Sequence, residues 1–465
     1  MNTNYKIVRC ILFLLGGATV LMGETQLLDL SKREAMVRTL ERNLGIRIEK
    51  SQLESSKEAI VAAKGDFDPE VSASFSTNSY EDLDTESIEL GVNGKTSVGT
   101  TYGLSATAAE GTDSPGGHDA FVGLSFRQPV LSGFGLSANL VDLRVARYQF
   151  DLSEWEYKQT VLDTLVATLN AYNDLYEAQQ NLAIAKRSRD LAKKLIEDDK
   201  RRVELGVRAR LDVTSTEAQY AFRQERVLQA INAEKQSQNR LKQLIFDNAE
   251  DALSIDIVPQ YYIDEYAEGD YKNYLDTLLE NSPQFRLAEL ALEIARVRLG
   301  QRSNEKLPSL DLIAQYGFSG IGGSVKGSFD DAISGDSDFY SLGIEARYPL
   351  FNRRARAREQ IANQDAISAE LDLQRIKQAI QLEFRTAYEI MLTNFQRVEA
   401  TRYAKEIAQR SLESEEKKLK AGTSSSFIVL RLQNDLASAE SRELFALSSY
   451  NRSVARFNRL RGVLE

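Results

Sequence analysis

Leu136 to Leu205 have the sequence LSANLVDLRVARYQFDLSEWEYKQTVLDTLVATLNAYNDLYEAQQNLAIAKRSRDLAKKLIEDDKRRVEL, which contains no Pro and no Gly, and Gly206 follows at once. As one helix rising ~1.5 Å per residue, this stretch spans about 105 Å. Because no ordinary globular core is that deep, the helix must pack against other long helices along its length.

The apolar residues of this stretch form two adjoining stripes. One stripe, at spacings of three and four, consists of Leu162, Leu165, Leu169, Tyr172 and Tyr176. The other, interrupted by the polar Arg189, consists of Ala171, Leu175, Ala178, Leu182, Ala185, Ala192 and Ile196. A sustained heptad repeat indicates left-handed supercoiling. Two seams on one helix therefore predict neighbours on two sides, as in a wall of helices.

Composition and the N-terminus indicate an exported protein. The chain has 465 residues and a net charge of −10, which argues against non-specific nucleic-acid binding. Residues 1–23 have the pattern of a signal peptide, with Lys6 and Arg9 before a short apolar run, and the alternative is an N-terminal membrane anchor. The only Cys, Cys10, lies inside this segment, so the mature chain would have no thiol. The rest of the chain contains no run of eighteen apolar residues, so the sequence predicts no membrane-spanning helix. An exported chain can still enter a membrane as β-strands.

The rest of the chain is an internal repeat. The predicted first repeat, 24–246, contains a helix, strands 70–80 and 119–129, the long helix 136–205 and a shorter helix 211–246. An acidic, Tyr-rich linker or equatorial segment, 247–270, precedes the second repeat, 271–465, with a helix, strands 309–318 and 340–349, the long helix 352–421 and a shorter helix 427–460. Pro129 matches Pro349, and Gly206 matches Gly422. Residues 80–120 could add a hairpin about Asn93-Gly94.

These elements predict a mainly α chain with a transmembrane β portion. The strands alternate apolar and polar residues, as a wall between lipid and a water-filled lumen requires. One chain has too few strands to close a barrel, and open sheet edges are not tolerated in lipid. Strands pooled from several subunits would form a β-barrel in a bacterial outer membrane, continued into the periplasm by a coiled-coil barrel of helices.

The chain resembles the TolC-like outer membrane efflux protein family over about residues 28–462. The matching segments are Gln128-Pro129-Val130-Leu131 with Gly133, Arg347-Tyr348-Pro349-Leu350-Phe351, Leu205-Gly206 followed by Leu211-Asp212-Val213 and Glu217-Ala218, and Ala421-Gly422-Thr423. The resemblance implies a homotrimer, four strands per subunit in a shared barrel, and a periplasmic helical tunnel. It also implies docking of the tunnel's inner end on a periplasmic adaptor protein and an inner-membrane transporter.

The turns after the two long helices are the predicted docking tip. The residues expected to contact the adaptor are Leu205, Gly206, Val207, Arg208, Ala421, Gly422, Thr423 and Ser424. The alternative is that the two glycines only end the helices. Basic residues gather on both hairpins, namely Arg201, Arg202, Arg208, Arg210, Lys417, Lys418 and Lys420. Favourable interaction of cations with helix C-termini also explains this charge.

The predicted constriction departs from the family pattern. The resemblance implies acidic pore residues shortly after the second turn, but the matching positions are Ile428 and Arg431. In the first repeat Asp212 occupies the equivalent place. Three copies of Asp212 would bring like charges together and favour a cation, whereas the alternative is an exposed carboxylate at a helix start. Arg431 is expected to pair with a carboxylate on a neighbouring helix and so to latch the closed state.

Other polar groups suggest no further chemistry. Arg353, Arg354, Arg356 and Arg358 could meet lipid headgroups or form ion pairs, but a solvated helix face explains them better. His118, the only His, has no companion ligands, and Asp330, Asp331, Asp336 and Asp338 lack calcium-loop spacing. With no nucleophile–base pair and no phosphate-binding loop, the sequence predicts no cofactor, no metal and no enzyme activity.

The function predicted from the sequence is passive export through the outer membrane, in contact with its lipid. The conduit would carry substrates from the inner-membrane pump and the adaptor to the exterior. Small-molecule efflux is favoured over type I protein secretion. The alternative is a soluble periplasmic coiled-coil scaffold or adaptor protein, which would have no need of the alternating strands.

Overall fold

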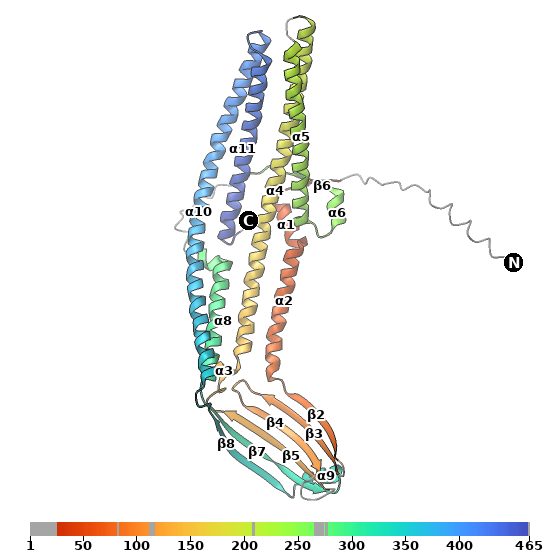
Figure 1. Ribbon diagram of the computed structural model, residues 1–465, viewed down its shortest axis with the longest axis vertical. Coiled ribbons are helices and arrows are strands. Elements are labelled where there is room, and N and C mark those ends of the chain that lie inside the picture. The colour runs from red at the N-terminus through yellow and green to blue at the C-terminus, as the bar shows by residue number, and fades with distance from the viewer. Residues whose placement is uncertain are drawn as a thin grey trace, which may run out of the picture. The chain divides into compact units, whose positions relative to one another are not determined.

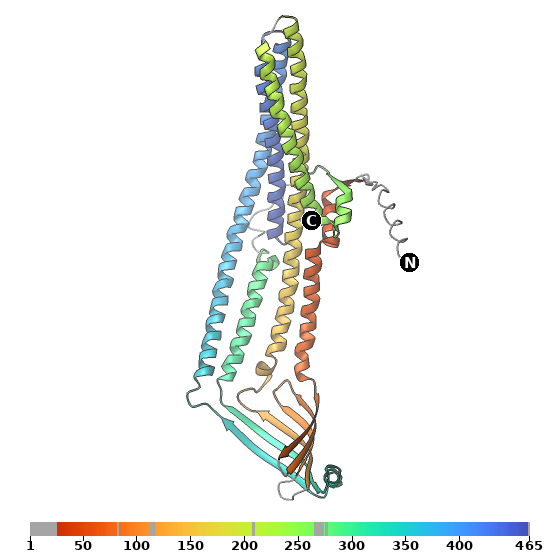
Figure 2. The ribbon, with the colours of Figure 1, turned by 45° about the vertical axis from the view of Figure 1, so that its right-hand side comes forward.

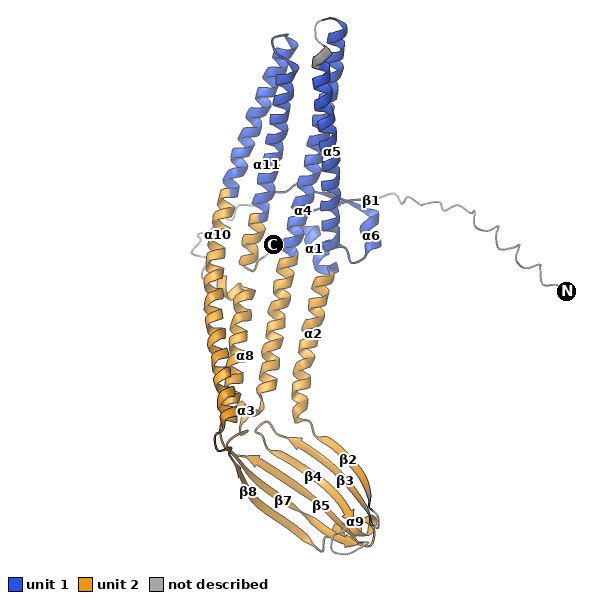
Figure 3. Ribbon diagram, in the orientation of Figure 1, with its two compact units in different colours: residues 1–43, 165–265, 394–452 blue, residues 44–164, 266–393, 453–465 orange. Residues whose placement is uncertain are grey.

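A computed structural model describes residues 26–80, 83–110, 117–206, 210–264, 274 and 278–463 (Figure 1). The predicted signal peptide, 1–23, lies outside these residues. The chain divides into two compact units, which Figure 3 colours separately. Unit 1 comprises residues 1–43, 165–265 and 394–452, and unit 2 comprises residues 44–164, 266–393 and 453–465.

Unit 2 contains a six-stranded sheet with β2 and β8 at its edges (Figures 1 and 2). Its strands, in order of pairing, are β2 (Glu70–Tyr80), β3 (Leu83–Lys95), β4 (Thr101–Glu110), β5 (His118–Pro129), β7 (Ser309–Gly322) and β8 (Asp338–Arg347). Every neighbouring pair is antiparallel. The four strands per subunit implied by the family resemblance are therefore wrong for this chain, because β3 and β4 form an additional hairpin between β2 and β5.

The turn of this hairpin lies later than expected. Asn93 and Gly94 are inside β3, where Asn93 is paired with Glu70 on one side and with Gly103 on the other. The chain reverses at residues 96–100 instead, where the Thr96 amide donates to the Thr100 carbonyl at 2.8 Å. Gly99 has a φ of +96°, a conformation that costs a glycine little. The position of the hairpin turn is therefore set by Gly99 and not by the Asn93-Gly94 pair.

The register places apolar side chains on one face of all six strands. Phe75 lies opposite Ile88, and Phe126 lies opposite Ala314. The same face carries Val71, Ala73, Leu90, Val92, Leu104, Ala106, Leu124, Leu312, Leu342 and Ile344. The other face carries Ser72, Ser74, Ser76, Glu89, Thr107, Ser125, Arg127, Gln315 and Glu345. One face thus suits lipid and the other suits water.

Helices in unit 2 differ from the sequence prediction in three places. The stretch predicted as one helix from residue 136 is split into α3 (Leu136–Asn139) and α4 (Val141–Glu204), because the Asn139 side chain donates to the carbonyls of Gly133 and Gly135. In the first helix of the second repeat, predicted from residue 271, the structure has a separate helix, α8 (Pro283–Glu305). This helix begins with Pro at its first position. The interval between the predicted strands 309–318 and 340–349 contains the end of β7 and helix α9 (Val325–Ser334).

α9 packs on the apolar face of the sheet. Its Ala332 is buried together with Ala108 of β4 and Ala120 of β5. A Cβ atom on Gly320 would lie 2.2 Å from the Ala332 nitrogen, so glycine permits this close approach. Small residues on three strands therefore let α9 pack closely against the sheet.

Unit 1 is built from long helices and a small parallel sheet. Its helical segments come from α1 (Lys32–Arg42), α4, α5 (Arg210–Ile245), α10 (Arg353–Lys420) and α11 (Ser426–Leu460). The predicted 247–270 linker is not irregular throughout, because it forms α6 (Ala249–Ser254) and β6 (Ile255–Pro259). β6 pairs in parallel with β1 (Gln26–Leu30), and the Tyr172 hydroxyl lies 2.8 Å from the carbonyl oxygens of both Leu30 and Gln260.

The helix predicted at the start of the first repeat is also broken. α1 ends before Asn43, whose backbone is extended and whose side chain donates to the Leu244 carbonyl at 3.1 Å. α2 (Leu44–Lys64) then follows. None of the helices in the described ranges combines the length and the apolar character that crossing a membrane requires.

Candidate docking tip and constriction

Both predicted tip glycines end long helices of unit 1. Gly206 and Gly422 have φ values of +74° and +76°, and the two turns lie at the same end of the unit (Figure 1). After α10 the Gly422 amide donates to the Leu419 carbonyl and the Thr423 amide to the Lys418 carbonyl, at 3.1 and 3.0 Å. This pair of bonds is a Schellman motif, in which the left-handed residue is usually Gly. Both glycines therefore have a structural role, whatever they contact.

The tip exposes apolar surface that its basic character does not suggest. Leu205 is 78% exposed, and Phe427, which the sequence analysis did not single out, is 68% exposed. Ala421, Gly422 and Thr423 are also exposed, and Ser424 is half-buried. Val207 and Arg208 lie outside the described residues. Leu205 and Phe427 give the tip apolar surface beside its basic residues, which makes it a candidate contact surface.

A buried carboxylate near the tip connects the two hairpins of unit 1. Asp199 of α4 is fully buried and accepts hydrogen bonds of 2.9 Å from Thr216 of α5 and from Ser426 of α11. Asp199 follows Ala192 by seven residues, so it continues the Ala171, Ala178, Ala185 and Ala192 stripe. Asp199 was not among the predicted site residues, although a carboxylate at a heptad core position is a detectable signal.

The predicted constriction residues have unequal surroundings. Ile428 is half-buried, Arg431 is exposed, and the Asp212 side chain is not described. In the described part of the chain Arg431 makes no ion pair, but its charge is among the causes that lower the pKa of Glu415. The larger causes are hydrogen bonds from Ser424, at 2.6 Å, and from Lys418, at 3.0 Å. The predicted ion pair of Arg431 with a neighbouring carboxylate is therefore not formed in the described part of the chain, and Glu415 of α10 is a carboxylate on which its charge acts.

The remaining sequence candidates fall on separate surfaces. Arg353, Arg354, Arg356 and Arg358 are all exposed at the start of α10. His118 is the first residue of β5, and Asp331 accepts a hydrogen bond from the Ile321 amide at 2.9 Å. Among the described residues, no group of three or more His, Cys, Asp and Glu side chains is placed to hold a metal ion.

The chain is similar to known proteins over most of its length. Residues 35–245 and 274–463 match the profile of a family described as outer membrane efflux protein. The alkaline protease secretion protein AprF of Pseudomonas aeruginosa is 22% identical over 352 residues, which cover 75% of this chain and 71% of AprF.

Solved structures with the same fold include two bacterial outer-membrane proteins. The CmeC outer membrane channel of Campylobacter jejuni has a TM-score of 0.72 and 17% identity, covering 93% of this chain and 85% of CmeC. The outer membrane protein VceC of Vibrio cholerae has a TM-score of 0.71 and 16% identity, covering 93% of this chain and 96% of VceC.

Proposed function

Because this chain belongs to the outer membrane efflux protein family, we propose that it is the exit channel of a tripartite export system. The chain is an outer-membrane channel with a helical periplasmic portion, and it is not an enzyme. In the proposed system a homotrimer passively conducts substrates that an inner-membrane transporter and a periplasmic adaptor deliver. The observation that carries the proposal is the six-stranded sheet, whose single apolar face is suited to outer-membrane lipid.

The proposed trimer closes its barrel with eighteen strands, six from each of three copies. The sheet of one chain leaves β2 and β8 as edges, and these two strands run in opposite directions, so β8 of one copy can pair in antiparallel fashion with β2 of the next. For strands ~4.7 Å apart and tilted by about 40°, eighteen strands give a backbone radius of about 18 Å, against about 12 Å for twelve. The extra hairpin thus widens the lumen.

Pairs of introduced cysteines test this closure. Ser341 on the polar face of β8 is replaced by Cys, together with Ser72→Cys, Ser74→Cys or Ser76→Cys on the polar face of β2 in separate variants. Oxidation is expected to give covalent trimers for at least one pair, and Ala73→Cys is the control because its side chain points to the other face. If none of the three pairs crosslinks, or if Ala73→Cys crosslinks equally, the β2–β8 closure is wrong.

We propose that the adaptor docks on the tip residues Leu205, Gly206, Val207, Arg208, Ala421, Gly422, Thr423 and Ser424, to which Phe427 is added. The exposed Leu205 and Phe427 side chains support this assignment. Leu205→Asp is expected to weaken co-purification with the periplasmic adaptor. Leu371→Asp, at another exposed leucine but on α10 in unit 2, is the control. Equal effects of the two variants would contradict docking at the tip.

We also propose that Asp212, Ile428 and Arg431 line the constriction, with Glu415 as the carboxylate that Arg431 engages. The charge of Arg431 is the smallest of the causes that lower the pKa of Glu415, so the proposed engagement is electrostatic and not a formed ion pair. Arg431→Glu is expected to raise single-channel conductance, and an unchanged conductance would exclude the latch.

For the cargo we propose small molecules, with proteins as the second candidate. The description of the matched family as outer membrane efflux protein favours the first, and the name of AprF, a protease secretion protein, favours the second. A deletion strain distinguishes the two: increased sensitivity to toxic compounds with an unchanged set of secreted proteins supports efflux, and the reverse supports secretion. Recovery of the chain in the soluble periplasm, as expected of a scaffold, would contradict both.

A further inference from the structure

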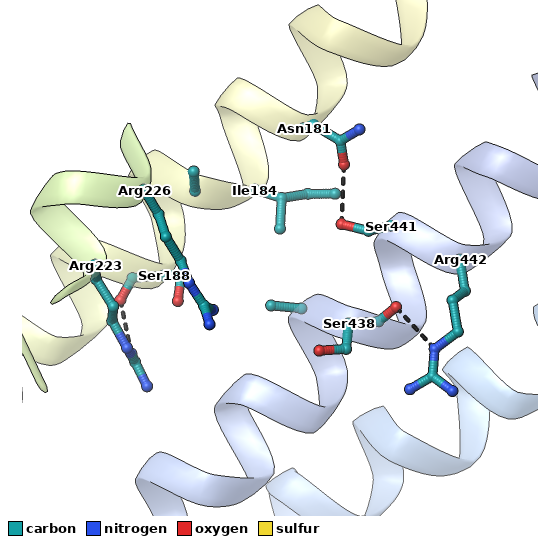
Figure 4. A pocket seen from close by; sticks show the side chains of 10 residues that line it. Asn181, Ile184, Ser188, Arg223, Arg226, Ser438, Ser441 and Arg442 are labelled. Atoms are coloured by element: carbon teal, nitrogen blue, oxygen red, sulfur yellow. Dashed lines mark hydrogen bonds between the residues drawn. The ribbon is translucent and has the colours of Figure 1, made fainter. Parts of the chain in front are cut away.

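A cavity in unit 1 collects positive charge, and no carboxylate of the described residues lines it. It has a volume of about 380 Å³ and lies among α4, α5 and α11. Its lining is Asn181, Ile184, Ala185, Ser188, Arg223, Arg226, Ala437, Ser438, Ser441 and Arg442. Three of these ten residues are arginines and none is acidic, and Figure 4 shows that the arginines come from α5 and α11.

Arg223 is the innermost of the three cations. It is 2% exposed, and its guanidinium donates to the Ser188 carbonyl at 2.8 Å, the Gln433 side-chain oxygen at 3.1 Å and the Leu430 carbonyl at 3.2 Å. All three acceptors are neutral, and the buried Nε has no hydrogen-bond partner. Burial and the charge of Arg226 lower the pKa of Arg223, although an arginine remains protonated at neutral pH. A buried charge without a counterion is costly, and this one has room for a counterion beside it.

Carboxylates close in sequence to the lining arginines have other partners. Glu225 of α5 accepts a hydrogen bond from Gln229 at 2.8 Å. Glu440 of α11 is paired with Arg187 at 3.0 Å, and Glu443 is paired with Lys405 at 2.5 Å. Within the described residues, neither Arg226 nor Arg442 forms an ion pair, and both are exposed enough to meet a ligand from solvent. Arg442 donates only to the backbone carbonyl of Ser438, at 3.2 Å. An anion from solvent would therefore meet three arginines that no carboxylate of the described chain pairs with.

We propose that this cavity binds a small oxyanion, carrying carboxylate or phosphate groups, between α4, α5 and α11. Arginine is suited to such ligands because its planar group donates two parallel hydrogen bonds. The serine hydroxyls and Asn181 supply further donors, and Ile184 with the two alanines forms an apolar wall. The volume falls in the range of small-molecule sites, so an organic anion the size of citrate can enter as well as inorganic phosphate. This proposal does not rest on the export function.

Binding of phosphate and of citrate to the full chain in detergent tests the proposal. Calorimetric titrations are made at constant ionic strength, adjusted with sodium chloride, so that a general salt effect is excluded. Saturable binding of at least one anion is expected. Arg226→Gln and Arg442→Gln should each weaken it by about tenfold or more, because each removes a charge-assisted hydrogen bond.

Two controls separate a binding role from a structural one. Arg410→Gln removes an exposed arginine of α10 that does not line the cavity, and it should leave the affinity unchanged. Arg226→Lys keeps the charge and should recover part of the affinity. Melting curves without anion select the variants that fold. Absence of saturable binding of both anions to the unaltered chain, or an equal loss in Arg410→Gln, overturns the proposal.

Discussion

Replacing Ser426 with Ala removes the hydroxyl group through which α11 is hydrogen-bonded to the buried Asp199 carboxylate of α4. A hydrogen bond to a charged group contributes about 1.5–3 kcal/mol. Since ~1.36 kcal/mol corresponds to a factor of ten, the balance between joined and separated hairpins should shift by about tenfold to about 150-fold. Because the two hairpins meet near the proposed constriction, we expect the shift to favour an open channel.

Single-channel recording in planar bilayers measures this shift. Ser426→Ala is expected to open more often than the unaltered channel at the same voltage. Thr216→Val is the matched control, because Thr216 donates to the same carboxylate at the same 2.9 Å but belongs to α5, in the same hairpin as Asp199. Loss of the hydrogen bond from Thr216 should lower the melting temperature without opening the channel.

The comparison of the two variants decides the role of the contact. If Ser426→Ala melts at a lower temperature but gates like the unaltered channel, the Asp199 contact only stabilises the fold. If Thr216→Val opens the channel as strongly as Ser426→Ala, the hydrogen bonding of the Asp199 carboxylate in general controls opening, and the bond between the two hairpins has no special role. Either result refutes the reasoning.

Three further predictions concern single positions. Gly422→Ala should cost about 1 kcal/mol of unfolding free energy, measured by denaturant titration, because φ is +76° although no atom lies within 4 Å of the new Cβ. Gly320→Ala should displace α9, because its Cβ would lie 2.2 Å from the Ala332 nitrogen, and faster hydrogen exchange over 325–334 would report the displacement. Glu415 has a lowered pKa, so its contribution to stability is present above the usual carboxylate pKa of about 4.3 and is lost as the pH falls through the lower folded value. Ser424→Ala should reduce that acid-dependent loss in melting experiments from pH 5 to pH 2.

The sequence predicted the long elements because their signals are long. The heptad stripes, the absence of Pro and Gly, and the repeated glycine turns led to α4 and α10 with ends that differ from the structure by only a few residues. The breaks were missed because single side chains produce them: Asn43 and Asn139 each donate to a backbone carbonyl that a sequence pattern does not locate. The same limit applies to Arg223, whose partners come from α4 and α11.

The most informative difference is the hairpin β3–β4. An insertion of one strand would reverse the direction of β5 and send α4 to the other side of the membrane, whereas two strands preserve the direction of both. The first repeat can therefore widen the sheet without changing the path of the helices, and the second repeat can keep only β7 and β8. Polar residues at 81–82 and 111–116 and glycine at the 96–100 reversal are the sequence features that permit this insertion. The two repeats thus share a helical plan while contributing unequally, four strands against two, to the proposed barrel wall.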